Sequence, residues 1–215
     1  HSLAKRLLSA SFNNKQIESS TKIFENGNIE FYFWDDIKGK NAFWHSSAHL
    51  FAQIILELYP KSKLTIGPPI DNGFYYDVDL GDKIISENDF EKIEKMMIDE
   101  ARKDHKFILR ESSKKDALDF YKKNGNQYKT ELINDLNDEK ITFCDHANFS
   151  DLCKGGHIPS TGHIKAVKLL NVAGAYWRGD EKNKQLTRVY GISFPKQKLL
   201  SEYLELIQEA KKRDH

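Results

Sequence analysis

Residues 42–59 read AFWHSSAHLFAQIILELY and decide how the first half of the chain folds. Their apolar residues recur at helical spacing and Pro60 ends the pattern, so we predict a helix over 42–59. The apolar positions are Ala48, Phe51, Ala52, Ile55, Leu56 and Tyr59. His45 and His49 stand four residues apart, which places both imidazoles on one face of the helix, where they can converge on one object.

The segments on either side mix strand and helix patterns without a regular alternation. We expect strands at 29–33, 64–66, 74–78, 107–109, 141–144, 164–170, 175–178 and 185–192. Further helices are expected at 90–103, 112–122, 128–136 and from Pro195 onward, with a turn-rich loop over 145–162. This order favours an α+β fold in which helices pack on antiparallel sheets.

The composition limits the class of protein. The 215 residues include 33 Lys and Arg against 32 Asp and Glu, so a strongly basic nucleic-acid coat is excluded, although a local basic face is not. Two cysteines cannot build a secreted disulfide scaffold, which favours a reducing, cytoplasmic location. No apolar run approaches the roughly 20 residues of a membrane span. Because the first residue is His1 rather than Met, we expect a piece of a longer protein.

A second segment that can carry chemistry is DLCKGGH at 151–157. Its thiol, Cys153, and its imidazole, His157, are separated by three residues, two of them glycines that allow a tight, exposed backbone. Together with His45 and His49 they form an N/S set that suits tetrahedral zinc or a water-activating cluster. The alternative is a structural cysteine beside ordinary half-buried histidines. No Glu lies between His45 and His49, so the zinc-protease pattern is absent.

A third group of residues is basic. Lys129, Lys165 and Lys168 could join other cations near Tyr176 and Trp177 to make a face suited to phosphates and stacked bases. The other cations are Arg178, Lys182, Lys184 and Arg188. Because 30% of the chain is charged, a solvated surface is the alternative for each of them.

Four segments resemble the N-terminal half of bacterial threonyl-tRNA synthetases, in that family's order and spacing across about residues 42–195. They are HSSAH (45–49), IGPPIDNGFYYD (66–77), DLCKGGH (151–157) and AGAYWRGD (173–180). The resemblance implies a truncated, TGS-like β-grasp domain over 1–37, an editing domain over 38–195 and a linker helix over 196–215. The synthetase core, with its ATP, Mg and Zn, would lie beyond His215, so no aminoacylation is expected from this chain.

The resemblance also implies a reaction, the hydrolysis of seryl-tRNA(Thr) made in error. The expected partner is the 3′ end of tRNA(Thr) carrying serine, with no membrane, and the full-length protein is expected to be a homodimer while this chain could be a monomer. The implied catalytic residues are His45, His49, Lys129, Cys153 and His157. The implied substrate-binding residues are Gly67, Tyr76, Asp151, Tyr176 and Arg178. Editing is expected to need no metal; zinc, if bound, would be held by His45, His49, Cys153 and His157.

Two rival interpretations stay open. The two His and the Cys-His pair are shared with alanyl-tRNA synthetase editing domains and their free-standing relatives, so the chain could be a metal-dependent deacylase of another aminoacyl-tRNA. The segments around Tyr76 and Trp177 favour the threonyl family instead. The second rival is a non-catalytic RNA-binding module with a structural zinc. Gly156 stands where many members of the resembled family carry proline, so we expect a looser loop that keeps both functional side chains.

Overall fold

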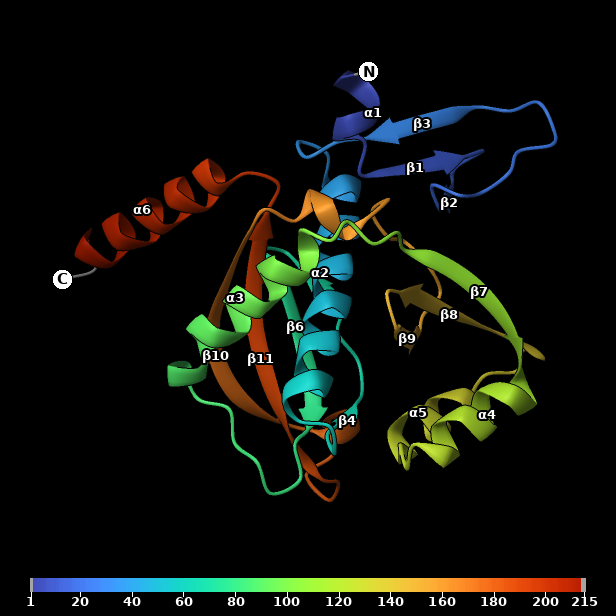
Figure 1. Ribbon diagram of the computed structural model, residues 1–215, viewed down its shortest axis with the longest axis vertical. Coiled ribbons are helices and arrows are strands. Elements are labelled where there is room, and N and C mark those ends of the chain that lie inside the picture. Colours follow the sequence, from blue (N-terminus) through green and yellow to red (C-terminus); the bar gives the residue numbers. More distant parts are fainter. Residues whose placement is uncertain (1, 214–215) are drawn as a thin grey trace.

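The computed structural model describes residues 2–213 and shows helices packed with three separate antiparallel sheets (Figure 1). This arrangement confirms the α+β class that the sequence predicts. A small N-terminal sheet comes first, and a larger central sheet follows. The third sheet is inserted in sequence between two strands of the central one.

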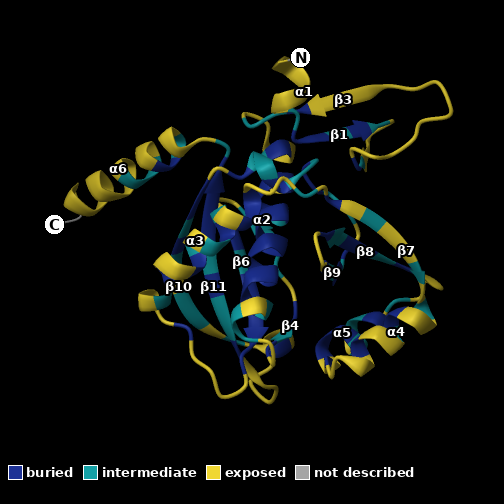
Figure 2. Cartoon of the chain, in the orientation of Figure 1, coloured by how far each residue is buried: buried dark blue, intermediate teal, exposed yellow. Residues whose placement is uncertain are grey.

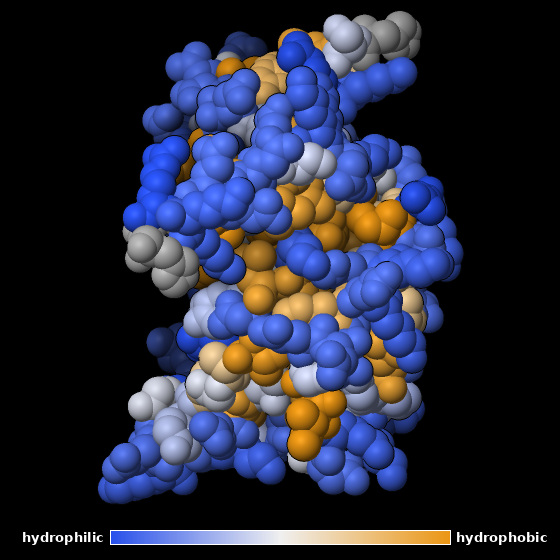
Figure 3. Space-filling view, turned by 90° about the vertical axis from the view of Figure 1, so that its left-hand side faces the viewer, coloured by the Kyte–Doolittle hydropathy of each residue, from blue (hydrophilic) through white to orange (hydrophobic). Residues whose placement is uncertain are grey.

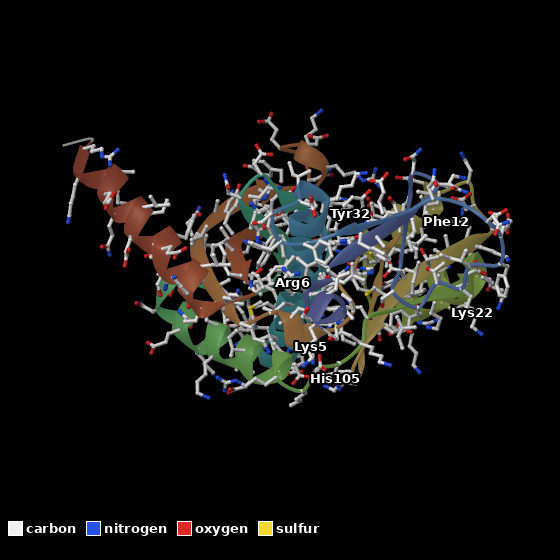
Figure 4. All side chains as sticks on the ribbon, turned by 90° about the horizontal axis from the view of Figure 1, so that it is seen from above. Lys5, Arg6, Phe12, Lys22, Tyr32 and His105 are labelled. Carbon is white, nitrogen blue, oxygen red and sulfur yellow. The ribbon has the colours of Figure 1, made fainter. Side chains whose placement is uncertain are left out.

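The N-terminal sheet has the strand order β2-β1-β3, with α1 before it. These elements are α1 (Ser2–Arg6), β1 (Ser9–Phe12), β2 (Lys15–Ile17) and β3 (Ile29–Tyr32). Leu8 is buried in the main core, and Trp34 packs edge-on against Phe43 and Trp44 of the following helix. The end of the sheet that carries Phe12 and Lys22 points away from the last helix, α6 (Gln197–Arg213) (Figure 4). The sheet is therefore anchored to the core by residues on both sides of it, Leu8 before β1 and Trp34 after β3.

The central sheet has the order β10-β11-β6-β4, and β5 pairs with β6. Its strands are β4 (Lys63–Leu64), β5 (Pro69–Ile70), β6 (Gly73–Asp79), β10 (Ala166–Tyr176) and β11 (Gln185–Phe194). Two helices pack against it, α2 (Ile37–Leu58) and α3 (Phe90–Ala101). Most of α2 is buried, as its apolar pattern predicts, and Figure 2 shows it as a mostly dark blue, buried helix at the centre of the molecule. Short 3-10 helices lie at η1 (Glu87–Asp89), η2 (Thr161–His163) and η3 (Trp177–Gly179).

The predicted start of the central helix is wrong, because α2 begins at Ile37 instead of residue 42. The polar run over 35–40 reads as a turn, but its last four residues, 37–40, form the first turn of the helix. Gly39 makes this possible, since a Cβ at that position would collide with the carbonyl oxygen of Phe33.

The third sheet, of order β7-β8-β9, carries two helices and a small core of its own. Its elements are β7 (Ile108–Ser113), α4 (Lys114–Lys123), α5 (Gln127–Asn134), β8 (Lys140–His146) and β9 (Phe149–Leu152). The predicted loop over 145–162 is therefore wrong in its first part. Ala147 adopts a positive φ of 49° and closes a tight hairpin between β8 and β9, which the turn-rich sequence concealed. Helix α4 also begins later than predicted, because the hydroxyl of Ser113 accepts a hydrogen bond from the N–H of Asp116 and caps it.

The two strands predicted over 164–170 and 175–178 are one strand, β10. Asn171 and Gly174 read as breakers in the sequence. The ladder with β11 accommodates them, because the register shifts between Leu169 and Asn171 and Gly174 pairs with Thr187. This strand lies at the edge of the central sheet.

Helix α6 follows Pro195, as the sequence predicts, and contacts β10 and β11. Residues 214–215 of the predicted linker helix and His1 of the predicted first domain lie outside the described residues. On the face turned toward the viewer in Figure 3, hydrophobic residues gather between hydrophilic ones. Leu206 and Ile207 of α6 are among the exposed large apolar side chains. Within residues 2–213, no helix is both long and apolar enough to span a bilayer.

Candidate active site

A cavity of about 700 Å³ brings together side chains from the central sheet, the third sheet and α2. Seven of the predicted site residues line it: His45, His49, Gly67, Tyr76, Lys129, Asp151 and Cys153. His157 is fully buried and lies directly behind Cys153. Segments more than 100 residues apart in sequence therefore meet at one place, which the spacing within each motif could not predict.

Helix α2 presents its two histidines to the cavity side by side. The ring centroids of His45 and His49 are 4.9 Å apart, as expected of residues one turn apart. Next to His45, Ser46 is buried, and its hydroxyl accepts a hydrogen bond from the N–H of Ile158 at 2.9 Å. The loop that carries Cys153 and His157 is thus fixed to the same helix that carries the two histidines.

Cys153 lies at the centre of the cluster. Its Sγ is 3.2 Å from Nε2 of His157 and 3.4 Å from Nε2 of His45, and it accepts a hydrogen bond from the N–H of Gly155. Burial raises the pKa of the Cys153 thiol, but the charge of His49 and the hydrogen bonds from His157 and His45 outweigh burial and lower it. The geometry therefore favours a thiolate at Cys153.

The other cysteine, Cys144 of β8, is buried and behaves differently. Burial is the main cause that raises the pKa of its thiol, to about 11. Cys144 is thus a protonated core residue.

His157 has a partner that the sequence did not reveal. Its Nδ1 lies 3.1 Å from Oε2 of Glu18, which follows β2 in the N-terminal sheet. Burial lowers the pKa of His157, but hydrogen bonds with Cys144, Cys153 and Glu18 outweigh burial and raise it. In the sequence, Glu18 stands in an ordinary polar stretch, so no local signal marks it.

Lys129 and Asp151 form a buried ion pair at the wall of the cavity. Nζ of Lys129 lies 2.7 Å from Oδ1 of Asp151, and each side chain is only 3% exposed. Asp151 also accepts hydrogen bonds from the hydroxyls of Tyr76 at 3.0 Å and Tyr121 at 3.4 Å. Burial raises the pKa of Asp151, but the charge of Lys129 and the contact with His49 outweigh burial and hold it well below its usual range. Tyr121 is a second residue that the sequence did not mark.

His49 also lies next to Asp151, but it makes no hydrogen bond of good geometry with it. Its Nδ1 lies 3.3 Å from Oδ2 of Asp151, an ion-pair distance, yet neither ring nitrogen finds a hydrogen bond of good geometry among residues 2–213. Both nitrogens are buried. Burial lowers the pKa of His49, but the negative charge of Cys153 and the contact with Asp151 raise it overall. Its ring nitrogens are the least committed in the cluster.

Comparisons with known proteins bear on this arrangement. A family model described as "Threonyl and Alanyl tRNA synthetase second additional domain" matches residues 141–190. Threonine--tRNA ligases of Flavobacterium psychrophilum and Flavobacterium johnsoniae are 60% and 61% identical to the chain over 213 and 212 residues, which is 99% of this chain and 33% and 32% of theirs. That of Cytophaga hutchinsonii is 51% identical over 213 residues, again 99% of this chain and 33% of its own length. Nearly the whole chain is thus homologous to one segment of bacterial threonyl-tRNA synthetases.

These matches confirm the resemblance, seen in the sequence, to an N-terminal segment of a threonyl-tRNA synthetase. The chain spans about a third of the length of the curated threonyl-tRNA synthetases it matches.

Two of the predicted substrate-binding residues of this synthetase segment do not line the cavity. Tyr176 and Arg178 lie at the tip of the β10–β11 hairpin, where both are more than 40% exposed. Arg178 pairs with Glu131 and Asp135 of α5. These contacts hold the helix that carries Lys129.

The basic residues singled out in the sequence are mostly paired along the central sheet. Lys168 lies 3.3 Å from Glu94, Lys184 4.0 Å from Asp79, and Arg188 makes two hydrogen bonds to Asp77. Each pairing offsets a positive charge locally, and the phosphate-binding face stays a prediction.

The four His and Cys side chains of this synthetase segment also fit a zinc ion. Their ligand atoms all lie within 4.8 Å of one another. In a tetrahedral zinc site, a thiolate sulfur and an imidazole nitrogen lie about 3.6 Å apart, and the two distances from Sγ of Cys153 to Nε2 of His157 and His45 are close to that value. The uncommitted ring nitrogens of His49 and the carboxylate behind His157 fit such a site as well. The cluster could therefore hold a metal.

Proposed function

We propose that this segment hydrolyses seryl-tRNA(Thr) to serine and free tRNA. The observation that carries the proposal is the convergence of Cys153, two histidines and the buried Lys129–Asp151 pair on one cavity of about 700 Å³. That volume lies within the usual range of small-ligand sites. Similarity to threonine--tRNA ligases supports an aminoacyl ester as the ligand.

The need for such a reaction follows from the similarity of serine and threonine. Serine lacks one methyl group, a difference worth about 1–3 kcal/mol in an apolar pocket, which is too little for accurate translation. A second site that is too tight for the extra methyl accepts serine and excludes threonine. Tyr76 and Gly67 support this arrangement, because the Tyr76 ring lies directly against the α-carbon of Gly67 and narrows the cavity.

In the proposed mechanism, water attacks the ester carbonyl carbon and the bond to the ribose oxygen breaks. The thiolate of Cys153 and its histidine partners act as one unit that takes a proton of the water and returns it to the ribose oxygen as that oxygen leaves. Lys129 stabilises the negative charge on the carbonyl oxygen, and Asp151 holds Lys129 in place. We place water ahead of the Cys153 thiolate as the nucleophile, since the ester is already reactive.

The test is the initial rate of deacylation of tRNA(Thr) charged with serine and, in parallel, with threonine. We expect serine to be released and threonine to be spared. The Lys129→Met variant should lose most of the activity, and Lys115→Met, which removes an exposed lysine of α4, should keep it. Equal rates on both esters would refute serine selectivity, and no release of either would refute deacylation by this chain.

A second candidate is zinc-dependent hydrolysis, which the spacing of the His and Cys ligand atoms favours. His45, His49, Cys153 and His157 would hold the ion, which would polarise the ester carbonyl or lower the pKa of a bound water. We propose that editing proceeds without it. Retention of activity after exhaustive chelation supports metal-free hydrolysis, and loss with recovery on adding zinc supports the second candidate.

The remaining parts of the proposal follow from the family. They are the tRNA(Thr) 3′ end as partner, a homodimeric full-length protein in the cytoplasm, and the division of the chain into a TGS-like segment (1–37), an editing domain (38–195) and a linker helix (196–215).

A further inference from the structure

Glu18 lies outside the editing domain proposed above, yet its carboxylate contacts His157 of the cluster. Oε2 is 3.1 Å from Nδ1 of His157, and Oε1 accepts a hydrogen bond from the N–H of Gly156 at 2.6 Å. The Glu18 side chain is 10% exposed and that of His157 is fully buried. A carboxylate from the N-terminal sheet therefore contacts a histidine that lies 139 residues further along the chain.

The contact fixes the state of the histidine. An ionised carboxylate only accepts hydrogen bonds, so Nδ1 of His157 must carry a proton, and Nε2 is turned toward Sγ of Cys153 at 3.2 Å. The ring of His157 thus bridges Glu18 and Cys153. A partner on the second ring nitrogen is the usual means by which proteins fix the tautomer and orientation of a functional histidine.

The surrounding backbone is shaped to receive this carboxylate. The N–H of Glu18 donates to the hydroxyl of Thr21, and the N–H of Thr21 donates to the carbonyl of Glu18, which fixes the turn after β2. On the other side, Gly155 and Gly156 have φ values of 109° and 92°, which strongly favour glycine. A Cβ on Gly155 would lie 2.9 Å from Oε1 of Glu18.

We infer that Glu18 is a positioning residue for the editing reaction, and that the N-terminal segment completes the active site by holding His157 toward Cys153. The role in catalysis rests on the proposed function, whereas the effect on His157 does not. Glu18 acts through His157 and does not line the cavity.

The first test compares Glu18→Gln and Glu18→Ala with Glu30→Gln in steady-state deacylation of seryl-tRNA(Thr). Glutamine has one acceptor oxygen, so either Gly156 or His157 loses its acceptor. We expect kcat to fall about 10- to 100-fold while KM changes less than about twofold. Glu30 is the matched control, because it lies on the same sheet and accepts a hydrogen bond from Tyr32 away from the cavity. Unchanged kcat in both Glu18 variants would overturn the inference.

The second test does not need activity. In the protein with ¹⁵N-labelled histidine, NMR should show a slowly exchanging proton on Nδ1 of His157, assigned with His157→Gln. The signal should be lost in Glu18→Ala and kept in Glu30→Gln. If it persists in Glu18→Ala, the inference is wrong even where kcat falls. If the wild type deacylates nothing but the signal depends on Glu18, the positioning of His157 stands and only the proposed reaction fails.

Discussion

The buried pair of Lys129 and Asp151 allows a quantitative prediction for the Lys129→Met variant. The side chains are each 3% exposed and their charged atoms lie 2.7 Å apart. At that distance the Coulomb attraction is about 6 kcal/mol for an effective dielectric constant of about 20. Desolvation offsets part of it, and breaking a buried pair by removing one partner costs about 3–5 kcal/mol. We therefore expect the free energy of unfolding to fall by about 3 kcal/mol, because Tyr76 and Tyr121 still donate to Asp151.

The assay is urea denaturation followed by circular dichroism at pH 7. Lys115→Met serves as the control, because its ion pair with Asp119 is exposed and its loss should be too small to resolve. The double variant Lys129→Met/Asp151→Asn removes both charges, so its loss should be smaller than the sum of the single losses by about 2 kcal/mol.

The same reasoning fixes the sign of the pH dependence. In the wild type, the pKa of Asp151 is lowered, so its contribution to stability is present above the unfolded pKa and is lost as the pH falls through the folded value. Without Lys129, the buried carboxyl takes up a proton at higher pH, and the deficit of the variant should shrink as the solution is acidified. A loss below about 1 kcal/mol for Lys129→Met, or additive losses in the double variant, would refute the buried ion pair.

Three further predictions concern other parts of the site. Iodoacetamide at pH 7 should alkylate Cys153, which lines the cavity with a lowered pKa, and spare Cys144, as peptide mass spectrometry would show. Gly67→Ala forces a Cβ into the Tyr76 ring and should lower the free energy of unfolding by about 1–3 kcal/mol in urea titrations; a neutral effect would contradict the close contact. His146 is buried, and burial is the main cause that lowers its pKa to about 3. Its contribution to stability is therefore present above the unfolded pKa of about 6.5 and is lost as the pH falls. Between pH 7 and pH 5 the wild type should lose about 2 kcal/mol more than His146→Gln, and equal losses would contradict a neutral buried His146.

The sequence predicts those parts of the site that depend on local periodicity. The pair His45 and His49 follows from the helical repeat, and the spacing of Cys153 and His157 is visible in one loop. Lys129 could be singled out only through the family resemblance, because its partner Asp151 lies on another element. Glu18 was missed because its contact with His157 depends on how two sheets dock, which no local pattern encodes.

The fold, too, is predicted from the sequence only where it depends on local patterns. The helices are predicted where a repeat of apolar residues packs against the core, as in α2 from residue 42 onward and in the part of α6 around Leu200. The errors fall where backbone pairing overrides local preference. Asn171 and Gly174 continue within β10 because β11 supplies their partners, and β9 exists because Ala147 accepts a left-handed turn.

The contacts that build the site are very distant in sequence, and this has a consequence for folding. Glu18 and His157 are 139 residues apart, and the indole N–H of Trp44 donates to the carbonyl of Ser193, 149 residues away. Closing such long loops costs entropy before any contact is gained, so contacts of this kind form late and slowly. During synthesis, α2 leaves the ribosome long before β11, which accepts the hydrogen bond from Trp44, and long before the loop that carries Cys153 and His157. The cluster around Cys153 is therefore among the last parts of the molecule to assemble, and its reactive thiol exists only in a chain that is already folded.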